Sequence, residues 1–207
     1  MNRRPVASRS TSWAQSITKL LVSANISPNQ ISMASILFAI LGAWGLLALN
    51  SWVGLLIFAL STQLRLLCNL FDGMVAIASG KSSPIGEIYN ELPDRISDSI
   101  FFIALGYACN YPHLGMLAAL FATLTVYIRL MGGNLGLPQN FIGPMAKQHR
   151  MTVVFVSCIF AIIEGFINNT NYSLVIGLSI VFLGSVITCF TRLHSIANNF
   201  SDNLKNN

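Results

Sequence analysis

Long apolar segments separated by short polar turns occupy most of the chain. A helix of about 20 apolar residues crosses the roughly 30 Å of hydrocarbon in a bilayer. Segments close to that length predict six transmembrane helices, at residues 31–49, 52–71, 87–109, 114–129, 152–167 and 174–192. The second is interrupted by Arg65 and the third by a group of acidic residues, so a hydropathy window alone would shorten both.

A different pattern precedes the first of these segments. Between residues 10 and 25, apolar side chains recur at the spacing of one helix face, at Trp13, Ile17, Leu20, Leu21 and Ala24. Polar residues such as Lys19 fall on other faces, which is typical of an amphipathic helix in the headgroup layer. Ser27, Pro28 and Gln30 then follow the pattern of a capping box, which predicts the start of the next helix.

The composition indicates a membrane protein. Hydrophobic residues make up 54% of the chain and charged residues only 9%, against about 25% charged residues in soluble domains. We therefore expect an all-α integral membrane protein that forms a single membrane domain over residues 1–207. Its parts would be an N-terminal amphipathic helix (10–25) and a core of six transmembrane helices (31–192).

The basic residues predict the orientation in the membrane. Most lie before the first segment, between the second and third, between the fourth and fifth, or after the last: Arg3, Arg4, Arg9, Lys19, Lys81, Lys147, Arg150 and Lys205. By the positive-inside rule, both termini and the acidic segment face the cytoplasm, at the inner membrane if the cell is bacterial. The net charge of +5 fits this topology and attraction to anionic lipid. We expect no nucleic-acid partner, because no basic patch is interleaved with aromatic residues.

Five of the seven acidic residues lie within residues 69–98: Asp72, Glu87, Glu91, Asp94 and Asp98. Carboxylates at membrane depth need a cation or a metal ion to offset their desolvation, so this group indicates a functional site. At 100° per residue, the last four acids and Asn90 share one helix face, and Asn69 and Asp72 share a face of the preceding helix. Two such faces would supply oxygen ligands suited to Mg²⁺ or Mn²⁺, which can neutralise a diphosphate. Small residues nearby would leave room for a nucleotide: Gly73, Ala76 and Gly86.

This arrangement resembles the signature of the CDP-alcohol phosphotransferase family, D-x-x-D-G-x-x-A-R, eight residues, then G-x-x-x-D-x-x-x-D. The matching positions keep that spacing: Asn69, Asp72, Gly73, Ala76, Gly86, Asn90 and Asp94. The amphipathic helix and the Ser-Pro-Asn turn are also similar, so the likeness covers nearly the whole chain. It implies a six-helix enzyme of phospholipid biosynthesis that transfers the phosphatidyl group of CDP-diacylglycerol to a small alcohol and releases CMP. It also implies that the first three acids hold two Mg²⁺ or Mn²⁺ ions and that the last, Asp94, is the general base.

The chain departs from this signature at three positions. Asn69 and Asn90 replace aspartates, and Ile77 replaces the arginine. An asparagine carbonyl can still bind Mg²⁺, but each replacement of an aspartate removes one negative charge. We therefore expect Glu91, next to Asn90, to help hold the metal.

Asp98 continues the acidic face by one further turn. A register with Asp94 and Asp98 as the last two acids would lengthen the spacer, so the spacing favours the first register. Asp98 has two interpretations: a metal-binding or positioning role, or an ion pair with Arg65, which lies on the face of Asn69 and Asp72. Both stay open at this point.

Three basic residues lie at or beyond the end of the fourth segment: Arg129, Lys147 and Arg150. Topology alone would explain them, but beside an acidic site they would also bind a phosphorylated acceptor. We expect glycerol 3-phosphate as the first candidate and inositol phosphate as the second. The expected partners are CDP-diacylglycerol, this small alcohol acceptor, the lipid bilayer and, as a candidate, a second copy of the chain.

Two other functions stay open. The carboxylates could be the ion sites of a cation transporter or channel, or the chain could resemble the family without its catalysis. A transport path needs polar residues across the bilayer, and the first, fifth and sixth segments have almost none in their middles. This favours the enzyme. Glu164, near the far end of the fifth segment, has no partner that the sequence identifies.

Overall fold

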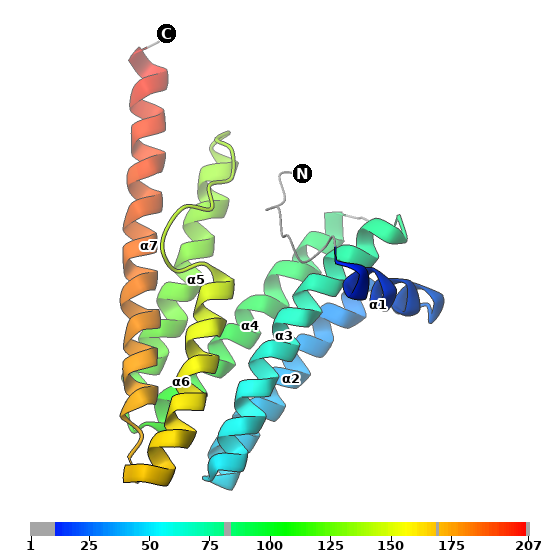
Figure 1. Ribbon diagram of the computed structural model, residues 1–207. Coiled ribbons are helices and arrows are strands. Elements are labelled where there is room, and N and C mark those ends of the chain that lie inside the picture. Colours follow the sequence, from blue (N-terminus) through cyan, green and yellow to red (C-terminus); the bar gives the residue numbers. More distant parts are fainter. Residues whose placement is uncertain (1–10, 81–83, 169, 206–207) are drawn as a thin grey trace.

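The computed structural model describes residues 11–80, 84–168 and 170–205 of the 207-residue chain. Over these ranges it contains seven helices and no strand (Figure 1): α1 (Ser12–Ser23), α2 (Pro28–Leu49), α3 (Trp52–Ala78), α4 (Pro84–Ala108), α5 (Pro112–Asn134), α6 (Lys147–Asn168) and α7 (Tyr172–Lys205). The all-α prediction is therefore confirmed. Arg3, Arg4, Arg9 and Lys81 lie outside the described residues, as do the side chains of Glu87 and Lys205.

Within the described ranges, five helices are long and apolar enough to cross a membrane. They are α2, α3, α5, α6 and residues 172–199 of α7. The charged residues in the first half of α4 exclude that helix from the set, although it is 25 residues long and packs against α2 and α5. The structure thus supports an integral membrane fold with five candidate spans.

All six predicted segments are helices, and the differences lie at their ends. α3 continues to Ala78, whereas hydropathy predicted its end at Phe71. The acid at Asp72 and the glycine at Gly73 interrupt the apolar stretch, but backbone hydrogen bonding carries the helix past them into the apolar residues 74–78. As a result Asp72, Gly73 and Ala76 lie inside α3 and are held by its backbone.

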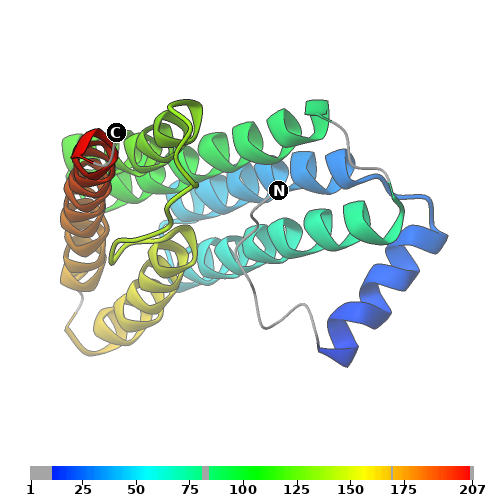
Figure 2. The same ribbon diagram turned by 90° about the horizontal axis from the view of Figure 1, so that it is seen from above.

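The helices form two groups that meet at an angle (Figures 1 and 2). α2 packs against α3 and α4, while α5 packs against α4 and α7, and α6 joins α3 to α7. One close approach joins α4 to α5, where a Cβ atom on Gly115 would lie 2.5 Å from the carbonyl oxygen of Phe102. Small residues at such a crossing let backbones touch, as in many membrane bundles.

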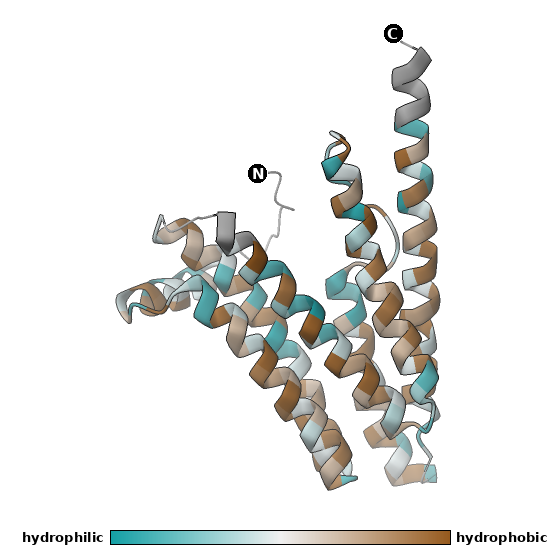
Figure 3. Cartoon of the chain, turned by 180° about the vertical axis from the view of Figure 1, so that it is seen from behind, coloured by the Kyte–Doolittle hydropathy of each residue, from teal (hydrophilic) through white to brown (hydrophobic). Residues whose placement is uncertain are grey.

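The outward faces of the helices are apolar, and the polar side chains are turned inward. Large hydrophobic residues such as Leu37, Trp44 and Phe166 are exposed, and Figure 3 shows hydrophobic positions along most of each helix, with hydrophilic ones gathered on the first half of α4. A soluble monomer rarely exposes so much apolar surface. The pattern is that of a surface solvated by lipid tails.

α1 lies across the bundle and contacts α3. Ala14 and Thr18 are buried against the bundle, and Trp13 packs edge-on against Phe71 at 6.1 Å between ring centroids. Leu20 on the predicted apolar stripe is exposed. The amphipathic helix is thus present, and the placement of its stripe in the headgroup layer stays a prediction.

The start of α2 is capped as the sequence predicted. The Ser27 hydroxyl accepts a hydrogen bond from the Gln30 amide at 3.3 Å, and the Gln30 side chain accepts one from the Ser27 amide at 2.8 Å. Both donors would otherwise be unsatisfied at the helix start.

Glu164 does have partners, which sequence analysis could not identify. Its Oε1 accepts hydrogen bonds from the Thr170 hydroxyl at 2.5 Å and the Tyr172 amide at 2.9 Å. Its Oε2 accepts from the amide and hydroxyl of Ser173, at 2.9 and 2.6 Å. A carboxylate at the end of α6 therefore satisfies the first amides of α7, where negative charge also favours the helix dipole.

We predict that Glu164→Ala lowers the thermal unfolding midpoint of the detergent-solubilised protein, because the first turn of α7 loses its acceptor. Glu164→Gln, which keeps one acceptor oxygen, is expected to fall between the wild type and the alanine variant. Thermal unfolding of the three proteins in one detergent provides the measurement. Equal midpoints for all three would show that water replaces the carboxylate without cost.

Candidate active site

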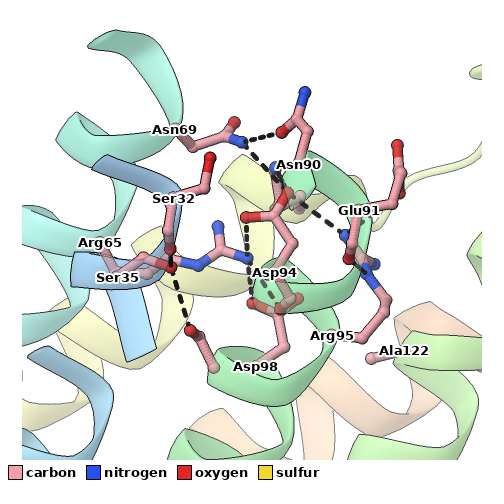
Figure 4. Close-up of polar contacts among 12 residues, drawn as sticks. Ser32, Ser35, Arg65, Asn69, Asn90, Glu91, Asp94, Arg95, Asp98 and Ala122 are labelled. Carbon is pink, nitrogen blue, oxygen red and sulfur yellow. Dashed lines mark hydrogen bonds and ion pairs between the residues drawn. The ribbon is translucent and has the colours of Figure 1, made fainter. Parts of the chain in front are cut away.

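The polar faces of α3 and α4 meet inside the bundle, as helical periodicity predicted. The side-chain amide of Asn69 on α3 donates to Asn90 Oδ1 at 3.3 Å and to Asp94 Oδ2 at 3.1 Å, both on α4 (Figure 4). Asp72 lies one turn further along α3. Three of the matched signature positions therefore contact one another across the two helices, and with Asp72 they form a candidate active site.

Asp94 is surrounded by donors. Its Oδ1 lies 3.1 Å from Arg65 Nη2, and its Oδ2 contacts the Lys147 ammonium group and lies 3.6 Å from Arg95 Nη2. The side chain is almost fully buried. Three cations from α3, α4 and α6 thus neutralise one carboxylate, and Lys147, at the first position of α6, brings that helix to the site.

Asp72 has a different environment, although it is equally buried. Its Oδ2 accepts a hydrogen bond from the Ser32 hydroxyl of α2 at 2.8 Å, while its Oδ1 is buried without a hydrogen-bond partner among the described residues. A buried carboxylate oxygen without a donor is costly unless a cation occupies the space before it. Ser32 was missed by sequence analysis, because serine is common in membrane helices and nothing marked this one.

Asp98 joins two buried arginines. Its Oδ1 lies 2.5 Å from Arg65 Nη2, and its Oδ2 lies 3.3 Å from Arg150 Nη2. All three residues are at most 2% exposed. The ion pair between Arg65 and Asp98 is therefore confirmed. Arg150, predicted at the acceptor, is turned into the bundle, where it also donates to the carbonyl of Met145 at 3.1 Å.

We predict that Asp98→Asn strongly destabilises the protein, because it leaves Arg65 and Arg150 without their shared partner in a low-dielectric interior. Breaking a buried ion pair from one side costs about 3–5 kcal/mol. Thermal unfolding in detergent measures the effect. Glu91→Gln, in a partly exposed pair, is the matched control and is expected to change stability much less; similar losses in both variants would mean that burial of the pair does not matter.

Glu91 pairs with two arginines. Its Oε1 lies 2.7 Å from Arg129 Nη2 and its Oε2 lies 3.9 Å from Arg95 Nη2, and Figure 4 shows it on the opposite side of Asp94 from Asn69. Arg129 also lies over the Phe141 ring at 5.0 Å. This geometry points Glu91 toward Arg129 instead of Asn90, and its role in holding metal stays a prediction.

The small residues of the signature line the same part of the two helices. Gly73 is buried in α3, Ala76 is half-buried one turn later, and Gly86 lies in the first turn of α4. Ile77, at the position of the signature arginine, is 64% exposed. The chain therefore has an apolar side chain where the signature places a cation, and that side chain faces outward.

The donor set fits one divalent ion better than two. Within the described ranges, no group of three or more His, Cys, Asp or Glu side chains lies close enough to hold a metal ion. The asparagines at two ligand positions account for this, since they leave Asp72 and Asp94 as the signature's only acids. Asp72 Oδ1 is available to a cation, and amide oxygens of Asn69 and Asn90 are suitable further ligands.

Comparison with known proteins gives a consistent result. A family model described as CDP-alcohol phosphatidyltransferase matches residues 25–189, a range that includes every signature residue. Archaetidylinositol phosphate synthase of Aeropyrum pernix is 34% identical over 144 residues, which cover 68% of this chain and 71% of that protein.

Solved structures of Mycobacterium tuberculosis phosphatidylinositol phosphate synthase have a similar fold. The structure in complex with manganese and citrate has a TM-score of 0.71 at 21% identity and covers 88% of each chain. The structure with CDP-DAG bound has the same score and identity and covers 90% of this chain and 94% of that one. At this level of identity the likeness concerns the fold.

Proposed function

Because this chain belongs to the CDP-alcohol phosphatidyltransferase family, a family of metal-dependent membrane enzymes of phospholipid biosynthesis, we propose that it transfers the phosphatidyl group of CDP-diacylglycerol to a small alcohol and releases CMP. The observation that carries this proposal is the meeting of the two signature halves across α3 and α4, with Asn69 bonded to both Asn90 and Asp94. Asp72 and Asp94 are the two family acids that the chain retains.

The metal in this proposal is Mg²⁺ or Mn²⁺. Asp72 would hold it through Oδ1, which has no hydrogen-bond partner in the described ranges, with amide oxygens of Asn69 and Asn90 as further ligands. Bound there, the ion would neutralise charge on the diphosphate of the lipid donor. Ser32 fixes the orientation of Asp72 by donating to its other oxygen.

Asp94 is the proposed general base. It would take the proton of the acceptor hydroxyl as the hydroxyl oxygen bonds to the phosphorus that carries diacylglycerol, and the bond from that phosphorus to CMP would break. Arg65 and Lys147 hold the carboxylate in place through its two oxygens. Gly73, Ala76 and Gly86 would let the nucleotide approach the two helices closely.

The proposed acceptor is a phosphorylated alcohol. Arg129, which pairs with Glu91, and Lys147, which pairs with Asp94, remain partly accessible, so their charges are available to the phosphate groups of the two substrates. The names of the relatives favour inositol phosphate, and glycerol 3-phosphate is the other candidate. Arg150 would act indirectly, through Asp98, because it is buried. A homodimer stays a prediction.

Incubation of the purified protein with CDP-diacylglycerol, Mg²⁺ or Mn²⁺ and a panel of alcohols tests this function. We expect CMP release that needs both the metal and a phosphorylated alcohol. No release with any acceptor, from folded protein, would favour a family member without catalysis. Cation flux through reconstituted vesicles in the absence of CMP release would favour the transporter.

We propose six spans, with α4 as the sixth, and both termini and the active site in the cytoplasm. The four native cysteines are buried, so introduced ones can be labelled with little background. We predict that an impermeant thiol reagent labels Tyr111→Cys from outside intact cells and labels Leu135→Cys only after lysis, since both side chains are exposed at opposite ends of α5. The reverse pattern would overturn the orientation.

We predict that Asp72→Asn and Asp94→Asn each reduce the rate of CMP release at least about 100-fold, the usual order for loss of a metal ligand or general base. Both changes keep the size of the side chain, so thermal unfolding can confirm that the variants are folded. Near-normal rates from either folded variant would remove that residue from the proposed mechanism.

We predict that Arg129→Ala raises the KM for the phosphorylated acceptor about tenfold or more and leaves the KM for CDP-diacylglycerol nearly unchanged. The reason is that a charge-assisted contact to phosphate contributes roughly 1.5 to 3 kcal/mol. Lys19→Ala on α1 is the control for a general loss of positive charge. A larger effect on CDP-diacylglycerol would move Arg129 to the lipid donor's headgroup.

A further inference from the structure

The candidate active site contains more cations than its acids need. Among the side chains that the structure describes, the ion pairs of the site join five cations, Arg65, Arg95, Arg129, Lys147 and Arg150, to three acids, Glu91, Asp94 and Asp98. Asp72 takes part in none of the ion pairs among the described residues. With Asp72 counted as the fourth acid, the described side chains of the site have one positive charge in excess. Aspartates at positions 69 and 90 would make the acids outnumber the cations.

The two retained family acids differ in what they can still bind. Both oxygens of Asp94 already face donors: Arg65 on one side, and Asn69, Lys147 and Arg95 on the other. A divalent ion at Asp94 would have to displace the Lys147 ammonium group or lie beside it, and like charges at contact distance repel strongly in a buried site. Within the described part of the chain, Asp72 Oδ1 is buried without a hydrogen-bond partner, and Asp72 forms no ion pair.

Lys147 is well placed to substitute for an ion. It comes from the first turn of α6 and reaches the same Asp94 oxygen that accepts from Asn69. An ammonium group is a compact point charge with three donors, so it can bind a carboxylate and a phosphate oxygen at once. Because the ammonium group is part of the chain, its positive charge is in the site whether or not a metal ion is bound.

We propose that the site holds a single divalent ion, at Asp72, and that the Lys147 ammonium takes the place of a second ion beside Asp94, where it would bind the diphosphate of a CDP-linked lipid. This inference rests on the proposed function for the identity of the diphosphate. It also explains how a site with asparagines at positions 69 and 90 could bind the diphosphate. The two asparagines lower the negative charge of the site, so the Lys147 ammonium and one divalent ion are enough to neutralise the diphosphate.

Counting bound Mn²⁺ tests the proposal without any turnover. Free and bound Mn²⁺ can be separated by electron paramagnetic resonance during titration of the full-length protein in detergent, with Mn²⁺ as the only added ligand. We expect one ion per wild-type chain and none at the same concentrations in Asp72→Asn. Two ions per wild-type chain, no ion at all, or one ion retained by Asp72→Asn would each overturn it.

A second pair of variants tests the role of Lys147. Asn90→Asp combined with Lys147→Gln restores an acid and removes the ammonium, so we expect two ions per chain, while Asn90→Asp combined with Lys19→Gln is expected to keep one. Thermal unfolding identifies any variant that fails to fold, and Asn90→Glu with Lys147→Gln is the substitute. One ion in every folded variant would contradict the role of Lys147.

The two proposals can fail separately. CMP release together with a count of two ions would overturn the single-ion site and leave the proposed function standing. A count of one ion that is lost in Asp72→Asn, together with no CMP release in the presence of any acceptor, would support the single-ion site and overturn the proposed enzymatic function.

Discussion

The buried guanidinium of Arg65 is the constraint on which the rest of the site depends. It lies in the middle of α3 with no exposed surface, so its charge must be balanced inside the protein. One of its nitrogens, Nη2, meets both Asp94 and Asp98 of α4, at 3.1 and 2.5 Å. A single side chain therefore fixes the rotation and height of α4 against α3, and with them the positions of the signature residues.

Arg150 extends this constraint to α6. It binds the other oxygen of Asp98, and Lys147, one turn earlier on the same helix, reaches Asp94. Ion pairs with Asp94 and Asp98 of α4 thus hold α6, the helix that carries both cations, in place. Such buried triads often add little to stability compared with apolar packing, since desolvation offsets the attraction. In this protein the triad of Arg65, Asp98 and Arg150 serves position instead, because it holds α3, α4 and α6 together around Asp94 and Lys147, the two residues proposed to act at the substrates.

Helical periodicity and spacing predicted the parts of this site that lie along single helices. The faces of Asn69 with Asp72 and of Asn90 with Asp94 were predicted correctly, as was the cap at Ser27, because each depends on residues within a few positions of one another. The end of α3 was placed too early, since a single acid and a glycine interrupt the apolar stretch without ending the helix.

Contacts between distant helices could not be predicted in the same way. Ser32, which orients Asp72, comes from α2, and the burial of Arg150 depends on how α6 packs against α3. Glu164 is a similar case, because its partners are amides and hydroxyls that lie across the turn between α6 and α7. The sequence predicts which residues are charged and on which helix face they lie. Which side chain each of them contacts depends on how the helices pack.

Replacing Arg65, Asp98 and Arg150 together tests most directly whether this triad positions Asp94 more than it stabilises the fold. In Arg65→Met, Asp98→Leu, Arg150→Met, no buried charge of the triad is left unpaired, and Asp94 keeps Lys147 and Arg95. The account predicts a thermal unfolding midpoint at or above that of the wild type, together with a large loss of CMP release because Asp94 loses the contact that fixes its orientation. A stable triple variant that releases CMP at the wild-type rate would contradict it.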